Sequence, residues 1–67
     1  MNIICNEKGM SVEAQTTLFY VLEQTGFHNQ TGIAIAVNNC VIPRTKWESH
    51  ELLEGDKILV IQATKGG

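Results

Sequence analysis

The chain has 67 residues, of which 43% are hydrophobic, and its formal net charge is −2. A domain of this size buries only about 60% of the surface that the unfolded chain exposes, so its core is thin and leaves no room for a deep ligand pocket. The sequence has no Lys/Arg cluster, no apolar run long enough to span a membrane and no signal-peptide pattern, so we expect a cytoplasmic protein that binds neither nucleic acid nor a membrane.

The beginning of the chain predicts a β-hairpin. Residues 1–5 are short and rich in β-branched side chains, which is typical of a strand. Residues 6–9 form the expected turn, in which Gly9 can adopt a positive φ. Apolar and polar residues then alternate over residues 10–15, which predicts a second strand paired with the first.

A helix is predicted over residues 17–25. Thr16 or Thr17 suits its N-cap, and Gly26 suits the position that ends it. Apolar residues spaced three and four apart form one face of this helix: Leu18, Val21 and Leu22. That face needs a packing partner, which a sheet would supply.

Two further strands are predicted after the helix. Residues 33–37 alternate Ile or Val with Ala, so one face of this strand is bulky and the other carries only methyl groups. Asn38 and Asn39 can adopt the positive φ angles of a tight hairpin turn. Residues 40–42 form the return strand, and Pro43 ends it at what we expect to be a sheet edge.

The connection over residues 44–53 is predicted to contain at most one turn of helix. Its large apolar residues Trp47, Leu52 and Leu53 are expected to tuck under the sheet, because side chains of this type are mostly buried. Trp47 in particular is predicted to anchor the connection by packing.

The last strand follows a turn signal at residues 55–56 and is predicted over residues 57–64, before a flexible tail at residues 65–67. The predicted order of elements is ββαβββ, an α+β domain in which one helix packs across a mixed sheet. We expect the first and last strands to lie side by side at the centre of the sheet, because both are apolar on two faces.

The two cysteines, Cys5 and Cys40, are each flanked by apolar residues. We expect both to be reduced, buried thiols that pack as small hydrophobic side chains. Together with His28 and His50 they lack the short paired spacings of structural zinc sites, so no metal site is predicted.

The chain ends in Gly66-Gly67. At about 7% glycine usage, two glycines in a row would occur here by chance about 0.5% of the time. Glycine has no side chain, so such a tail is slim enough to thread a narrow channel and present its terminal carboxylate inside another enzyme. A carboxylate is a poor electrophile, but joined to AMP it becomes a mixed anhydride that a sulfur nucleophile can convert to a thiocarboxylate.

Several short segments of the sequence together match one known family. They are residues 36–38, Val41-Ile42-Pro43-Arg44, Trp47, Leu53-x-Gly55-Asp56-x-Ile58 and Gly66-Gly67. In these segments the chain resembles the ThiS family, the sulfur carriers of thiamin biosynthesis. The Gly-Asp pair and the terminal Gly-Gly occur in many ubiquitin-like carriers, whereas the Pro-Arg-x-x-Trp segment is more specific. The resemblance covers residues 1–67 and implies a single domain with the ubiquitin-like β-grasp fold.

The resemblance implies a recycled cosubstrate and not an enzyme, with no catalytic residue, metal or bound cofactor of its own. Gly67 would be adenylated by a ThiF-like adenylyltransferase, which uses ATP and magnesium, and would then become a glycyl thiocarboxylate. The sulfur would come from cysteine through a cysteine desulfurase, and a ThiG-like thiazole synthase would take it up. Gly66 contributes to the slim tail, and Lys65 either steers the tail toward an acidic groove or serves solubility.

The implied fold also indicates which face of the last strand partner proteins would reach. Counting back from the terminal glycines, as in ubiquitin-like folds, puts Ile58 and Val60 in the core. Residues on the opposite face form the expected docking surface: Ile4, Ala34, Ala36, Leu59 and Ile61. Ile61 is the member of this set nearest the tail, which makes it the strongest docking candidate.

Other functions stay open at the level of sequence. A molybdopterin synthase small subunit also ends in Gly-Gly, although the Pro-Arg-x-x-Trp segment speaks against it. A ubiquitin-like protein modifier would join Gly67 to lysines of its targets, and a plain interaction module would have an inert C-terminus. An enzyme is least expected, because the sequence has no phosphate-binding glycine loop, no paired metal ligands and no nucleophile–base pair.

Overall fold

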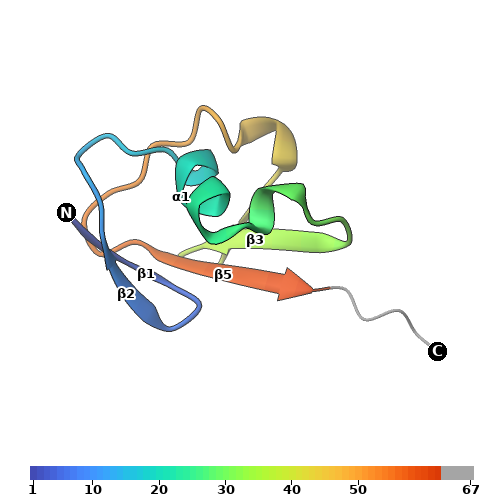
Figure 1. Cartoon of the computed structure of the whole chain (residues 1–67), viewed down its shortest axis with the longest axis horizontal. Helices are drawn as coiled ribbons and strands as arrows, with labels where there is room; N and C mark the ends of the chain where they lie inside the picture. The colour runs from blue at the N-terminus through green and yellow to red at the C-terminus, as the bar shows by residue number, and fades with distance from the viewer. Residues whose placement is uncertain (63–67) are drawn as a thin grey trace.

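A computed structural model describes residues 1–62, which form a five-stranded mixed sheet with one α-helix across a face of it (Figure 1). In chain order the elements are β1 (Asn2–Cys5), β2 (Lys8–Ser11), α1 (Leu18–Thr25), η1 (Phe27–Asn29), β3 (Ile33–Val37), β4 (Cys40–Ile42), η2 (Arg44–Lys46) and β5 (Lys57–Gln62), where η1 and η2 are short 3₁₀ helices. The strands lie in the order β2-β1-β5-β3-β4. The predicted α+β class and ββαβββ order are therefore confirmed. The last two residues of the predicted final strand, 63 and 64, lie outside the described residues.

β1 and β2 form an antiparallel hairpin whose turn is shorter than predicted. The turn consists of Asn6 and Glu7, with φ angles of 51° and 71°, while Gly9 lies inside β2 without a positive φ. The positive φ expected at Gly9 is therefore wrong. A two-residue turn with both φ angles positive matches the twist of the flanking strands, so β2 begins at once after it. β2 covers Lys8–Ser11, and the strand predicted over residues 10–15 is wrong beyond Ser11, where the chain leaves the sheet toward α1.

The helix α1 begins and ends where the sequence predicts. Thr17 is the N-cap, and its Oγ1 accepts a hydrogen bond from the backbone N of Tyr20 at 3.2 Å. A cap of this kind is worth about 1 kcal/mol. Gly26 ends the helix in the left-handed conformation, with a φ of 85°. The predicted apolar face is the buried one: Leu18, Val21 and Leu22.

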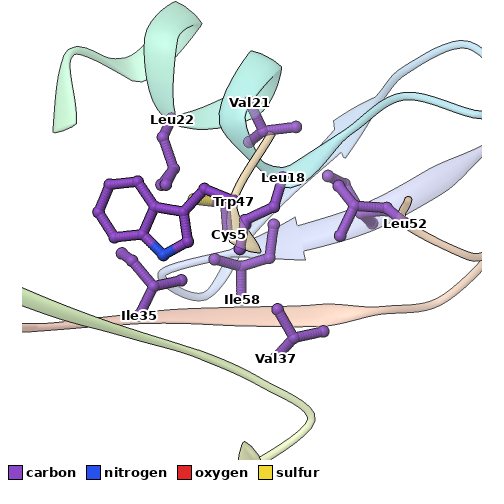
Figure 2. Close-up of a cluster of buried hydrophobic side chains, with 10 residues drawn as sticks. Cys5, Leu18, Val21, Leu22, Ile35, Val37, Trp47, Leu52 and Ile58 are labelled. Atoms are coloured by element: carbon purple, nitrogen blue, oxygen red, sulfur yellow. The ribbon is translucent and has the colours of Figure 1, made fainter. Parts of the chain in front are cut away.

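The core lies between this helix face and the sheet. Figure 2 shows the side chains of α1 pointing toward those of β3 and β5. The buried cluster consists of Ile3, Cys5, Leu18, Val21, Leu22, Ile35, Val37, Trp47, Leu52 and Ile58. β5 is the middle strand, parallel to β1 and antiparallel to β3. The expectation that the first and last strands are central neighbours is thus confirmed.

The connection between β4 and β5 packs against the core through two of its three large apolar residues. Trp47 and Leu52 are buried, and Trp47 Nε1 donates a hydrogen bond to Ile42 O at 2.9 Å. Leu53, however, is 69% exposed, so its predicted burial is wrong. The backbone N of Leu53 donates to Asp56 Oδ2 at 2.8 Å in the turn that precedes β5, and in this turn the Leu53 side chain points to solvent.

The two cysteines are both free, and they differ in exposure. Cys5 is buried, and this burial raises the pKa of its thiol because the charged form is desolvated. Cys40 is exposed, so its predicted burial is wrong. It is the first residue of β4, a three-residue strand at the edge of the sheet, where one neighbouring strand covers it instead of two.

None of the helices in residues 1–62 has the length and apolar character that crossing a membrane requires. The longest of them, α1, has 8 residues. A membrane-spanning helix needs about 20 apolar residues.

Candidate functional site

The residue predicted to react, Gly67, and its neighbours Gly66 and Lys65 lie outside the described residues. The described chain stops at Gln62, the last residue of β5, which is five residues before Gly67. Five residues span at most about 17 Å when fully extended. Any enzyme that acts on the carboxylate of Gly67 must therefore approach the end of β5 closely, so the surface around that strand is the candidate site.

Side chains along β5 alternate between the core and the outer face of the sheet, the face away from α1. Ile58 is buried, and Val60 is partly buried against the core. Leu59 and Ile61 point the other way and are 48% and 42% exposed. The predicted division of the strand into core-facing and outward-facing residues is therefore correct for all four positions.

The neighbouring strands extend this apolar surface on both sides of β5. Ala34 lies opposite Ile61, and Ala36 lies opposite Leu59 in the antiparallel pairing with β3. In the next strand, Val41 lies opposite Ala36 and is 60% exposed. Paired residues share a face of the sheet. We call this apolar surface the outer patch, and it consists of Ile4, Ala34, Ala36, Val41, Leu59 and Ile61.

Two members of the outer patch differ from the sequence-based expectation. Ala36 is only 4% exposed, because its larger cross-strand neighbours Leu59 and Val41 stand on either side of its methyl group. It therefore forms the floor of the patch and not a protruding contact. Val41 was not predicted, although the alternation in β4 signals it: Ile42 packs on the core, so the residue before it must face outward.

The outer patch is bordered by charge at the end where β5 begins. Ile4 of β1 is partly buried and pairs with Lys57 in the parallel register. A hollow of about 350 Å³ opens beside them, and it is lined by Ile4, Glu7, Asn39, Lys57, Ile58 and Leu59. The patch therefore has an apolar centre near the end of β5 and a charged margin at the opposite end, an arrangement typical of a surface that binds another protein.

A hydrogen-bond network around Asp56 fixes the start of β5. Asp56 is almost fully buried, and its carboxylate accepts from Leu53 N at 2.8 Å and from Asn38 Nδ2 at 2.9 Å. Asn38 Oδ1 in turn accepts from Lys57 N at 3.0 Å. Because Asn38 belongs to the predicted turn after β3, with a φ of 52°, this network ties that turn to the first residues of β5 and so sets the geometry of the patch.

The Pro-Arg-x-x-Trp segment lies between β4 and β5 and stabilises the loop that leads into β3. The Arg44 guanidinium lies over the Trp47 ring, 4.4 Å from its centroid. Its Nη1 and Nη2 donate to the carbonyls of His28 at 3.4 Å and Gln30 at 2.9 Å. Arg44 thus fixes the loop that leads into β3. Gln30 in that loop also accepts a hydrogen bond at its Oε1 from Gln62 Nε2 at 3.3 Å.

The feature of residues 1–62 that suits a function is a surface on which another protein can dock. No three His, Cys, Asp or Glu side chains in this part of the chain come close enough together to hold a metal ion. What the fold does present is an exposed apolar face of a central strand whose continuation is the Gly-Gly end of the chain. Such a surface suits docking of a partner that then acts on the C-terminus.

Known proteins resemble this chain over its full length. The model of the ThiS family matches residues 3–67. The chain is 37% identical over 67 residues to the sulfur carrier protein ThiS of Escherichia coli strain K12, and the comparison covers all of both proteins.

Solved structures share the fold as well. The crystal structure of the thiamine biosynthesis protein ThiS from Geobacter metallireducens gives a TM-score of 0.81 at 20% identity, covering all of both chains. The NMR structure of a thiamine biosynthesis protein from the same organism gives a TM-score of 0.70 at 19% identity, covering all of this chain and 88% of the other. At these identities the likeness shows the fold alone, and it agrees with the β-grasp fold expected from the sequence.

Proposed function

The chain belongs to the ThiS family and is a sulfur carrier of thiamine biosynthesis, and from this we propose that the carboxylate of Gly67 is the group that carries the sulfur. As a carrier, the protein is a substrate of partner enzymes and not an enzyme itself. The family assignment also decides in favour of the thiamine pathway over the molybdopterin synthase alternative. The observation that carries the proposal for Gly67 is a Gly-Gly end that is separated, in the sequence, by three residues from a strand with an exposed apolar face.

The proposed chemistry begins with activation by a ThiF-like adenylyltransferase that uses ATP and magnesium. The carboxylate oxygen of Gly67 attacks the α-phosphorus of ATP, pyrophosphate leaves, and an acyl-adenylate forms. A persulfide that received its sulfur from cysteine through a cysteine desulfurase then attacks the acyl carbon with its terminal sulfur, AMP leaves, and an acyl disulfide forms. A thiol cleaves this disulfide, which leaves a thiocarboxylate at Gly67 and a new disulfide between the thiol and the sulfur donor. A ThiG-like thiazole synthase takes up this sulfur, and the carrier returns to its carboxylate form. Since activation requires ATP, we propose that the cycle runs in the cytoplasm.

We propose that the outer patch is where the adenylyltransferase docks. Leu59, Ile61 and Val41 expose apolar side chains that a partner can bury, and Ile61 lies six residues before Gly67. Lys65 and Gly66 bridge between this docking surface and the reacting carboxylate. In this account the fold supplies recognition, and the slim tail supplies access to the active site of the partner.

An intact-mass measurement tests the proposed role of Gly67. After incubation with the adenylyltransferase, ATP, magnesium and a sulfur donor, we expect the mass change of one oxygen replaced by sulfur. A variant extended by one alanine beyond Gly67 should stay folded and unmodified, because the reacting carboxylate is displaced from its place. Thiocarboxylate formation on the extended chain would refute the proposal, and conjugates linked to lysine would instead indicate a protein modifier.

A further inference from the structure

The strand β5 has two edges, and only one of them is paired along its whole described length. Toward β3 the antiparallel pairing continues from Val37 and Ile58 to Ile33 and Gln62. Toward β1 the parallel pairing covers Lys57 and Ile58 alone. Among residues 1–62, no strand lies beside the four following residues of β5 on the β1 side.

Asn6 ends the pairing with β1. Its backbone N donates to Ile58 O at 3.0 Å, as a continuing parallel strand would. Its φ of 51° then turns the chain away into the hairpin, and its side-chain Oδ1, in place of its backbone carbonyl, accepts from Val60 N at 3.0 Å. Asn6 therefore satisfies one more group of β5, and beyond it the edge is open.

The pattern of hydrogen bonds shows which groups remain at this open edge. Lys57 exchanges bonds with Asn38 on the β3 side, so the backbone groups of Leu59 and Ile61 also point toward β3, and those of Val60 and Gln62 point away from it. Within the part of the chain that the structure describes, Val60 O and Gln62 N have no hydrogen-bond partner. They are one acceptor and one donor on either side of Ile61.

An open edge of this kind is normally protected against pairing with other chains by charged residues, proline or a bulge. Residues 60–62 are Val, Ile and Gln and contain neither a charge nor a proline. The edge next to the tail is therefore available to an added strand.

We propose that an extended segment of the adenylating enzyme adds to β5 at this edge and bonds Val60 O and Gln62 N through its own backbone. The inference rests on the proposed function, and the chain length identifies the occupant. Gly67 is only the fifth residue after Gln62, so the enzyme that activates Gly67 lies within about 17 Å of this edge. One residue of a strand parallel to β5 would satisfy both groups, because in a parallel ladder a residue donates and accepts on either side of its partner, here Ile61.

A matched pair of variants tests this inference in the full chain. Gln62→Pro removes the free N–H, and Gln62→Ala removes the same side chain but keeps the N–H. Because this N–H faces away from β3, proline costs no hydrogen bond within the protein and both variants should keep the fold, as thermal unfolding will check. In ATP-dependent adenylation, we expect Gln62→Pro to raise the KM for the carrier about tenfold over Gln62→Ala, as the loss of one hydrogen bond predicts.

Amide hydrogen exchange on the unmodified chain gives a readout that needs no variant. In the free protein the Gln62 amide should exchange fast and the Ile61 amide slowly, and binding of the enzyme should slow exchange at Gln62. Equal KM values for the two variants, or a Gln62 amide that still exchanges fast in the complex, would overturn the added strand while adenylation of the unmodified chain still supports the proposed function. If the unmodified chain is not adenylated at all, both proposals fail.

Discussion

Replacing Ile61 by aspartate probes the outer patch at the member nearest the tail. Ile61 is 42% exposed in the free protein. Burying a whole Ile side chain is worth about 1.5–3 kcal/mol, so a partner that covers the exposed part gains about 1 kcal/mol. Ile61→Ala should therefore lower the kcat/KM of adenylation about fivefold.

The aspartate variant should be affected far more strongly. Besides losing the apolar contact, Ile61→Asp forces the partner to desolvate an unpaired carboxylate, which costs several kcal/mol even after relaxation. A total loss of about 3 kcal/mol corresponds to at least a hundredfold drop in kcat/KM. The assay is ATP–pyrophosphate exchange with the adenylyltransferase at varied carrier concentration.

A control separates docking from a general effect of added charge. Tyr20 is 49% exposed and lies in the first turn of α1, on the other side of the molecule from the outer patch. Tyr20→Asp places the same carboxylate near a helix N-terminus, where it is tolerated, and adenylation should stay near the unmodified level. If folded Ile61→Asp is adenylated as well as Tyr20→Asp, the outer patch is not the docking surface.

The remaining predictions concern the groups that hold the fold. Arg44→Ala should lower the free energy of unfolding in urea by about 1–2 kcal/mol, since it removes the cation–π contact and two exposed hydrogen bonds. Arg44→Lys should restore only part of this loss, because a lysine ammonium stacked on Trp47 cannot also reach both carbonyls. Asp56→Ala removes a buried carboxylate that accepts two partly buried hydrogen bonds, and it should lower the free energy of unfolding by about 2–4 kcal/mol. A loss under about 1 kcal/mol would contradict the role given to this network. At pH 8 a thiol reagent should label Cys40 well before Cys5, as peptide mass mapping will show. Burial raises the pKa of Cys5 above its ordinary 9.0, so as the pH rises the Cys5 thiol ionises first in the unfolded state. The stability that Cys5 contributes is therefore fully present below pH 9.0 and is lost as the pH rises through the folded-state pKa. Thermal unfolding of Cys5→Ala as a function of pH should lack this part of the loss of stability at high pH.

The elements with strong local signals were predictable from their own residues. Thr17 and Gly26 bound the helix, because a side-chain cap and a left-handed glycine are properties of the chain at those positions. Asn38 and Asn39 form the expected turn for the same reason. In β5, alternation alone separated buried Ile58 from exposed Leu59 and Ile61 once one face was assigned to the core.

Predictions failed where the answer depends on what lies beside a residue in space. Ala36 is buried by the larger residues on the strands to either side of it. Of the neighbours Leu52 and Leu53, only Leu52 reaches the core cluster, and the sequence does not distinguish the two. The edge position expected for residues 40–42 is confirmed, but the burial predicted for Cys40 is wrong, because at this edge only β3 lies beside it. Alternation in β4 indicates that Val41 faces outward, but its place in the outer patch beside Ala36 follows from the pairing of β4 with β3.

The order of residues along the chain was thus enough to indicate the kind of elements, their sequence and the reactive Gly-Gly end, because caps, turns and alternation act over a few residues. The assembled fold was needed to reveal which side chains make up the outer patch and where β5 keeps an unpaired edge. Both features arise from strands far apart in the sequence becoming neighbours: the turn after Cys5 is a local signal, but only the register of β1 against β5 shows which residues of β5 that turn leaves unpaired.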